Sequence, residues 1–194
     1  MINTIDIQKL REETQAPIME CKKALEEAEG DKEKAKRILK KKGELRAEKK
    51  QNSSTKSGRV ESYIHSNGKV GALVELRCET DSVAKNKDFI HLAHDLAMQV
   101  AATNPLYLSP QVIPEKTLAE KRKEYTEDIK KSQKPPEIQE KIIQGKLKKL
   151  FEEICLEEQP FIKDDSKTIK EVIREAIAKF GEKIEISHFA RFAI

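Results

Sequence analysis

Apolar residues recur at three- and four-residue spacing through the first 40 residues, the pattern of amphipathic helices. Ile7 and Leu10 mark a first short helix, which Thr4 is placed to cap. A second stripe follows Pro17, a residue suited to the first turn of a helix. A third follows Gly30-Asp31, a helix stop and then a helix cap. The stripes are Ile18, Cys21, Leu25 and Ala28, and then Ala35, Ile38 and Leu39. The sequence therefore predicts three short helices with a small shared core.

The pattern changes to two-residue alternation in the middle of the chain. Residues 51–58 contain no apolar side chain and are typical of a flexible linker. Residues 59–66 and 69–78 then read as two strands, and Asn67-Gly68 predicts a tight two-residue turn between them. The last ten residues alternate again, through Ile184, Ile186, Ala190, Phe192 and Ile194. Together these segments predict a three-stranded antiparallel sheet.

Helical spacing dominates the rest of the chain. We expect one helix from Thr80-Asp81 to about Asn104, a charged helix from Pro114 to about Ser132, and a longer helix after Pro135-Pro136. Pro160-Phe161 reads as extended, and Ser166 as the cap of a last helix that Gly181 ends. The predicted fold class is α+β, a three-stranded sheet covered by helices.

The amino-acid composition limits the classes of function that this chain can have. The chain has 194 residues, 37% of them charged and 5% aromatic, with seven Gly and no Trp, which argues against phosphate-cradling loops and large aromatic sites. No apolar run approaches the roughly 18–20 residues of a membrane span, and no leader pattern precedes the first helix. We therefore expect a cytoplasmic protein that does not contact a membrane. Cys21, Cys78 and Cys155 form no CxxC pair, which favours reduced thiols.

The net charge of +4 is concentrated in the N-terminal part of the chain. Residues 1–58 hold 15 basic and 11 acidic side chains, whereas the remainder holds 23 of each. Eight basic residues lie between Lys36 and Lys50, against Glu44 and Glu48. This run has two interpretations, a solvated helix face, which we favour, or a nucleic-acid-binding patch. No aromatic residue interleaves with it, so the stacking platform of single-strand binders is missing.

The search for catalytic chemistry finds no phosphate-binding, dinucleotide-binding, nucleophile-elbow or zinc-protease motif. Asp88, His91, His94 and Asp95 share one helix, but edge-of-core histidines are the more ordinary explanation than a metal site. Cys78 and His65 form a conceivable nucleophile and base, yet Cys78 lies on an apolar strand face. We therefore expect no catalytic residue, no metal ligand and no cofactor.

Four segments carry a family resemblance. The block CETDSVAKNKDF at 78–89 and the block LREETQAPIMECKKALEEAEGDKEKAKRILKKKG at 10–43 closely resemble the elongation factor Ts family. The stretches KPPEIQEKIIQGKLKKLFEE and QPFIKDDSKTIKEVI resemble its C-terminal module. With one core region, the chain is similar to the short members of that family. The resemblance implies a three-helix domain of the ubiquitin-associated type at 1–50, a linker at 51–58, and a core and dimerisation domain at 59–194 with a protruding helical hairpin at about 114–156.

The resemblance also implies a function, guanine-nucleotide exchange on elongation factor Tu by protein–protein binding, without bond chemistry. In the family, the TDFV segment disturbs the Mg²⁺ site of the partner and loosens GDP. The implied counterpart here consists of Thr80, Asp81, Ser82 and Val83. Ser82 stands where the family has an aromatic wedge, so the acidic contact is implied but the wedge is not. A helix cap is the ordinary interpretation of Asp81.

Further implied contacts with elongation factor Tu are Ile18, Met19, Lys22, Phe161 and Ile162. Met19 as core filler and Phe161 as a core anchor are the competing interpretations. A homodimer is also implied, because a three-stranded sheet leaves an open edge that a second copy can cover. No direct contact with nucleic acid is expected under this hypothesis; the rival hypothesis is a nucleic-acid-binding adaptor that uses residues 36–50.

Overall fold

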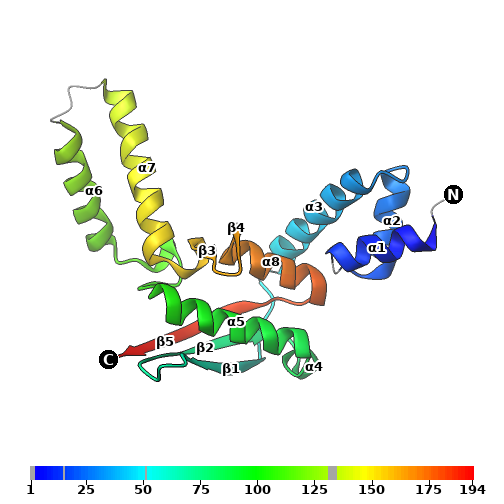
Figure 1. Ribbon diagram of the computed structural model, residues 1–194. Helices are drawn as coiled ribbons and strands as arrows, with labels where there is room; N and C mark the ends of the chain where they lie inside the picture. The colour runs from blue at the N-terminus through cyan, green and yellow to red at the C-terminus, as the bar shows by residue number, and fades with distance from the viewer. Residues whose placement is uncertain (1–2, 15, 51, 131–134) are drawn as a thin grey trace. The chain divides into compact units, whose positions relative to one another are not determined.

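The computed structural model describes residues 3–14, 16–50, 52–130 and 135–194. The described residues form α-helices, short 3₁₀ turns and strands, so the predicted α+β class is confirmed (Figure 1). The α-helices are α1 Thr4–Thr14, α2 Ile18–Glu27, α3 Lys32–Lys50, α4 Asp81–Ala84, α5 Lys87–Thr103, α6 Glu115–Lys130, α7 Pro136–Ile154 and α8 Ile169–Phe180. The strands are β1 Ser57–Ile64, β2 Val70–Cys78, β3 Pro160–Phe161, β4 Asp164–Thr168 and β5 Glu185–Ala193.

The three N-terminal helices form where the apolar stripes predict them. Gly30 has φ +88° after α2, and Asp31 accepts a hydrogen bond from the N–H of Lys34 at 3.0 Å, so the stop and the cap are confirmed. Thr4 is not the cap of α1, because Asn3 Oδ1 accepts from the N–H of Ile5 at 3.3 Å. The buried residues of this small core are Leu10, Ala16, Cys21, Ala24, Leu25, Ala28, Ala35 and Leu39.

The three-stranded antiparallel sheet is confirmed, with the order β1-β2-β5. The prediction of a two-residue turn between β1 and β2 is wrong. The N–H of His65 donates to the carbonyl of Val70 at 2.8 Å, and that of Gly68 donates to the carbonyl of His65 at 2.8 Å. The loop is therefore longer, and of Asn67 and Gly68 only Gly68 has positive φ, at +67°. Strand β1 also begins at Ser57, inside the predicted linker.

One face of this sheet is buried and the other is open. Ala72, Val74, Leu76 and Cys78 of β2 are buried, as their alternation predicts. Of the alternating residues predicted near the C-terminus, only Ile184 and Ile186 are buried, because Ala190 is exposed, Phe192 is 70% exposed and Ile194 is 98% exposed.

The long helix predicted from Thr80 to Asn104 is two helices. Asn86 lies between α4 and α5, and its side-chain oxygen accepts from the N–H of Asp88 at 2.9 Å. This local bond starts a new helix at Lys87. The break leaves α4 with only four residues, directly after β2.

Helices α6 and α7 form an antiparallel hairpin with its own small core (Figure 1). Ile129, Ile143 and Leu147 are buried in it, and Leu118, Tyr125, Ile142, Leu150 and Phe151 pack around them. The predicted end of the first helix at about Ser132 lies outside the described residues.

The C-terminal segment differs from the prediction at Ser166. Pro160-Phe161 is extended, as predicted, and pairs as β3 with β4 in a two-stranded antiparallel sheet. Ser166 lies inside β4 and caps no helix, because α8 begins at Ile169. Gly181, with φ +72°, ends α8 as predicted.

The contacts within the chain divide it into two compact units. The first comprises residues 1–61, 75–93 and 171–187, and the second residues 62–74, 94–170 and 188–194. The domain boundaries predicted at 50 and 58 remain predictions.

Candidate partner-binding site

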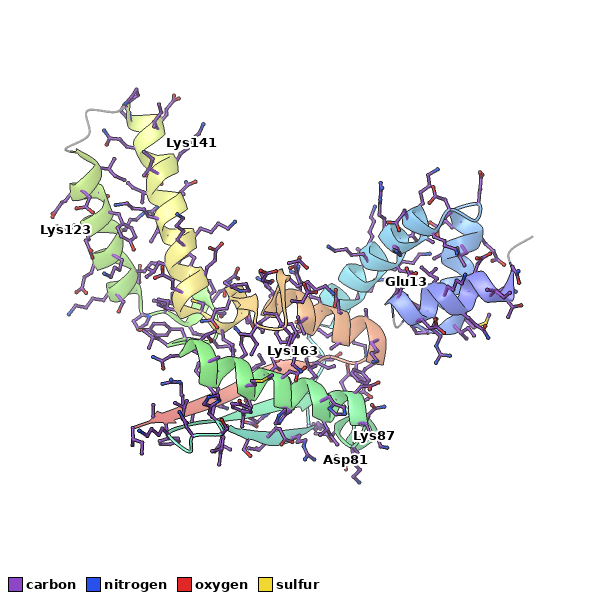
Figure 2. All side chains as sticks on the ribbon, in the orientation of Figure 1. Glu13, Asp81, Lys87, Lys123, Lys141 and Lys163 are labelled. Atoms are coloured by element: carbon purple, nitrogen blue, oxygen red, sulfur yellow. The ribbon has the colours of Figure 1, made fainter. Side chains whose placement is uncertain are left out.

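The Thr80–Val83 segment lies in the first unit, at the junction of β2 and α4 (Figure 2). Thr80 is the N-cap of α4, and its hydroxyl accepts from the N–H of Val83 at 3.4 Å. The cap interpretation of Asp81 is therefore wrong. Asp81 is the first residue of the helix, and its carboxylate is exposed together with the side chain of Ser82. Val83 is partly buried.

Asp81 has one polar partner that the sequence did not indicate. The hydroxyl of Ser57 donates to Asp81 Oδ1 at 2.6 Å, across 24 residues of chain. Ser57 belongs to the segment that reads as a linker, and no local pattern connects it with Asp81. This bond holds the carboxylate at the surface without neutralising its charge.

Thr80 is fixed on every polar atom. Its backbone N–H and hydroxyl both donate to the carboxylate of Glu182, at 3.0 and 2.6 Å. Its carbonyl accepts from the thiol of Cys78 at 3.2 Å and from the N–H of Ala84 at 3.2 Å. The residue before Asp81 is therefore rigidly placed in the free protein.

Cys78 is a buried packing residue. Burial raises the pKa of its thiol, and the negative charge of Glu182 raises it further. A nucleophilic cysteine needs the opposite shift, because the thiolate is the reactive form. The interpretation of Cys78 as a small hydrophobe is confirmed.

The N-terminal candidates lie on α2, in the first unit. Met19 is 59% exposed, so its interpretation as core filler is wrong. Ile18 is exposed as well, and Lys22 forms a long ion pair with Glu26 at 3.9 Å. Ile18 and Met19 thus present apolar surface beside a cation, a combination common in protein interfaces.

Phe161 and Ile162 lie in the second unit, where β3 ends. Phe161 is partly buried, and Ile162 is exposed. The side chain of Gln99, itself fully buried, donates to the carbonyl of Pro160 at 3.1 Å and accepts from the N–H of Ile162 at 2.9 Å. Gln99 therefore binds the backbone on both sides of Phe161.

The carboxylates of the conceivable metal site are engaged elsewhere. Asp88 pairs with Lys179 at 2.8 Å, which lowers the pKa of the Asp88 carboxyl through a hydrogen bond and charge attraction. Asp95 pairs with Lys163 at 2.6 Å. Across the described ranges, no group of three or more His, Cys, Asp or Glu side chains is placed to hold a metal ion.

The basic run on α3 is partly neutralised. Lys36 pairs with Glu13 and Glu33, and Lys42 pairs with Glu27 at 2.6 Å. Lys50 pairs with Glu79 at 2.9 Å. The side chains of Glu44, Arg46 and Glu48 lie outside the described residues. These ion pairs within the protein neutralise part of the positive charge of residues 36–50, which favours the interpretation as a solvated helix face.

The candidate residues include one exposed carboxylate, that of Asp81, and the exposed apolar side chains of Ile18, Met19 and Ile162. Such a composition is typical of the class of proteins that act by binding another protein. In the part of the chain that the structure describes, no helix is long and apolar enough to cross a membrane.

Comparison with known proteins gives the family. The family model for elongation factor Ts matches residues 6–194. The elongation factor Ts of Thermotoga petrophila is 50% identical over 188 residues, covering 97% of this chain and 94% of the relative. That of Thermodesulfovibrio yellowstonii is also 50% identical with the same coverage, and that of Solidesulfovibrio magneticus is 45% identical over 193 residues, covering 100% and 96%. The chain belongs to the elongation factor Ts family and is a translation elongation factor.

Proposed function

We propose that this chain is a guanine-nucleotide exchange factor that binds elongation factor Tu carrying GDP, disturbs its Mg²⁺ site and promotes GDP release and GTP reloading. The observation that carries the proposal is the exposed carboxylate of Asp81 on a backbone that Glu182 and Cys78 hold in place. A fixed negative charge brought close to a bound Mg²⁺ competes with the metal's own ligands. The factor needs no nucleotide pocket or cofactor of its own, because the nucleotide belongs to the partner.

Exchange of this kind is a coupling between two binding events. If the factor weakens GDP binding to elongation factor Tu, then GDP weakens binding of the factor by the same ratio. Ile18, Met19 and Ile162 supply exposed apolar surface for the association, while Asp81 supplies the contact that depends on the metal. The proposal accordingly describes a binding catalyst rather than an enzyme, acting in the cytoplasm with its proposed partner.

The test uses elongation factor Tu loaded with fluorescent GDP. We expect the full chain to accelerate GDP release at rising concentrations up to a plateau. We expect Asp81→Ala to lower the plateau about tenfold or more, because the variant lacks the negative charge that competes with the ligands of the bound Mg²⁺ once the complex has formed. Asp165→Ala, an exposed aspartate in the β4 strand, is the matched control. An unchanged release rate at saturating factor would refute the function.

A second copy of the chain is the proposed partner on the open sheet face. Ile64, Leu73, Phe192 and Ile194 are all exposed there, on three adjacent strands of the second unit. The N–H of Ile194 donates to the carbonyl of Lys69 at 3.0 Å, a register that puts Ile194, Phe192 and Leu73 on one face. A contiguous apolar sheet face of this kind suits a self-complementary two-fold contact.

The homodimer is tested by mass measurement in solution. We expect the wild-type chain to have twice the mass of one chain, and Phe192→Glu to have the mass of one, because a charge cannot be buried unpaired in an apolar contact. Val112→Glu, at an exposed apolar residue outside the sheet, is the control. A wild-type chain of single mass at micromolar concentration would rule out this interface.

A further inference from the structure

Glu182 connects the end of α8 with the candidate site. It follows Gly181, whose positive φ ends the helix, and it lies 102 residues from Thr80 in the sequence. Its Oε2 accepts from the N–H groups of Glu79 at 3.1 Å and Thr80 at 3.0 Å. Its Oε1 accepts from the Thr80 hydroxyl at 2.6 Å. One carboxylate therefore accepts three hydrogen bonds from two successive residues.

Glu79 makes the reciprocal contact. Its Oε1 accepts from the N–H of Lys183 at 2.7 Å and from the ammonium group of Lys50 at 2.9 Å. The Lys183 N–H is the main cause, and Lys50 the second, of a lowered pKa of the Glu79 carboxyl, which stays ionised at neutral pH. The segments 79–80 and 182–183 thus exchange carboxylate-to-backbone hydrogen bonds in both directions. We call these four residues the carboxylate clamp.

The clamp is needed because α4 cannot place itself. A helix of four residues is far below the length at which a helix persists alone in water. The direction of α4 therefore depends on contacts at its start. Thr80 donates two hydrogen bonds to Glu182 and caps the helix by accepting from the N–H of Val83. Asp81 follows Thr80 directly, so the position of its backbone depends on the clamp, and Ser57 adds one hydrogen bond to the carboxylate itself.

We propose that Glu182 is a positioning residue for nucleotide exchange, which acts through Thr80 to hold the Asp81 carboxylate where it meets the partner's metal site. The proposal rests on the proposed exchange function and goes one step further, since Glu182 itself need not touch elongation factor Tu. A charge that must approach a metal site closely loses much of its effect when it is displaced by about 1 Å.

A positioning role and a purely stabilising role make different predictions. If Glu182 positions Asp81, its loss lowers the maximal rate of GDP release more than it raises the half-saturating concentration. Its effect must also vanish when Asp81 is already absent, because the two residues then act through one contact. If Glu182 only stabilises the fold, its effect on release is the same with and without Asp81.

The experiment measures release of fluorescent GDP from elongation factor Tu by wild type, Glu182→Ala, Asp81→Ala and the double variant. We expect Glu182→Ala to lower the plateau about tenfold with less than a threefold change in half-saturation, and the double variant to match Asp81→Ala. Glu182→Gln keeps an oxygen for the two backbone N–H groups and is expected to fall between wild type and Glu182→Ala. Glu137→Gln, at an exposed glutamate of α7, is the control for lost charge.

The outcomes separate the two proposals. A wild-type chain that does not accelerate release overturns exchange and the role of Glu182 with it. If wild type is active and the plateau rate of Glu182→Ala lies within twofold of it, only the positioning role is overturned. The same holds if the double variant is slower than Asp81→Ala by the same factor by which Glu182→Ala is slower than wild type. Amide hydrogen exchange at residues 79 and 80 gives a readout independent of the partner: both amides are expected to exchange faster in Glu182→Ala and Glu182→Gln. If Glu182→Ala does not fold, Glu182→Gln decides by the same criteria.

Discussion

Gln99 is a fully buried polar residue whose side chain makes three hydrogen bonds. Its amide nitrogen donates to Gln159 Oε1 at 3.2 Å and to the Pro160 carbonyl at 3.1 Å, and its amide oxygen accepts from the N–H of Ile162 at 2.9 Å. Gln159 in turn accepts from the Thr103 hydroxyl at 2.7 Å. The change to test is Gln99→Leu, which keeps the side-chain volume approximately and removes all three bonds.

The magnitude follows from the partners that remain. Gln159 Oε1 keeps the bond from Thr103, whereas Pro160 and Ile162 both lose a bond to a fully buried side chain. Both backbone groups are only part-buried, so each loss is expected at the low end of the about 1–3 kcal/mol that an unsatisfied buried polar group costs. The burial of a leucine side chain offsets part of this cost, which leaves an expected loss of about 1–2 kcal/mol in the free energy of unfolding.

The assay is urea unfolding followed by circular dichroism, with amide hydrogen exchange at Ile162. We expect a lower urea midpoint and faster exchange of the Ile162 amide. Gln144→Leu, at an exposed glutamine of α7, should stay within about 0.5 kcal/mol of wild type. A Gln99→Leu protein as stable as that control would refute the reasoning, because water or backbone rearrangement would then replace all three bonds.

Three further predictions concern the first unit. Ser82→Phe introduces an aromatic side chain at an exposed position and should tighten the complex with elongation factor Tu by roughly 2–4 kcal/mol, read by titration; unchanged affinity would mean that no pocket faces this residue. Gly58→Ala should destabilise the fold by about 1–3 kcal/mol in urea, because its Cβ would lie 2.5 Å from the carbonyl oxygen of Leu76; a neutral variant would contradict that close approach. Glu79→Gln should remove stability that is present above the carboxyl's ordinary pKa of 4.5 and lost as pH falls through its lowered pKa in the folded protein. The stability difference from wild type, measured by urea titration from pH 7 to pH 3, should therefore shrink with acidification, and a constant difference would contradict the linkage.

The sequence predicted the elements whose faces differ in polarity. Strand β2 alternates cleanly, and its four inward residues are all buried. Strand β4, with the sequence DDSKT, has no apolar alternation, so its pairing with β3 could not be seen and Ser166 was assigned to a helix cap. The helix break at Asn86 could not be predicted for a related reason. The apolar spacing continues across Asn86, while its side chain starts a new helix.

The candidate site, too, has features that the sequence predicted and features that it could not predict. The start of a helix at Thr80-Asp81 is a local property and was predicted, although the cap is Thr80 and not Asp81. Ser57 and Glu182 could not be, because they lie 24 and 102 residues from their partners in the site. Apolar periodicity reports which face of an element is buried, and it carries no information about which distant carboxylate accepts a backbone N–H.

Two of the proposed contact segments, at Asp81 and at Phe161, are held in place in the same way. Asp81 belongs to a four-residue helix and Phe161 to a two-residue strand, and neither element is stable by itself. In both cases a side chain from elsewhere in the chain, Glu182 or Gln99, holds the adjacent backbone through several hydrogen bonds. Because these bonds are made to backbone groups and to the Thr80 hydroxyl, the position of each segment does not depend on the exposed side chains of Ser82 and Ile162. A change of either side chain is therefore expected to keep the anchoring geometry, so the contact surface can vary while its placement is kept.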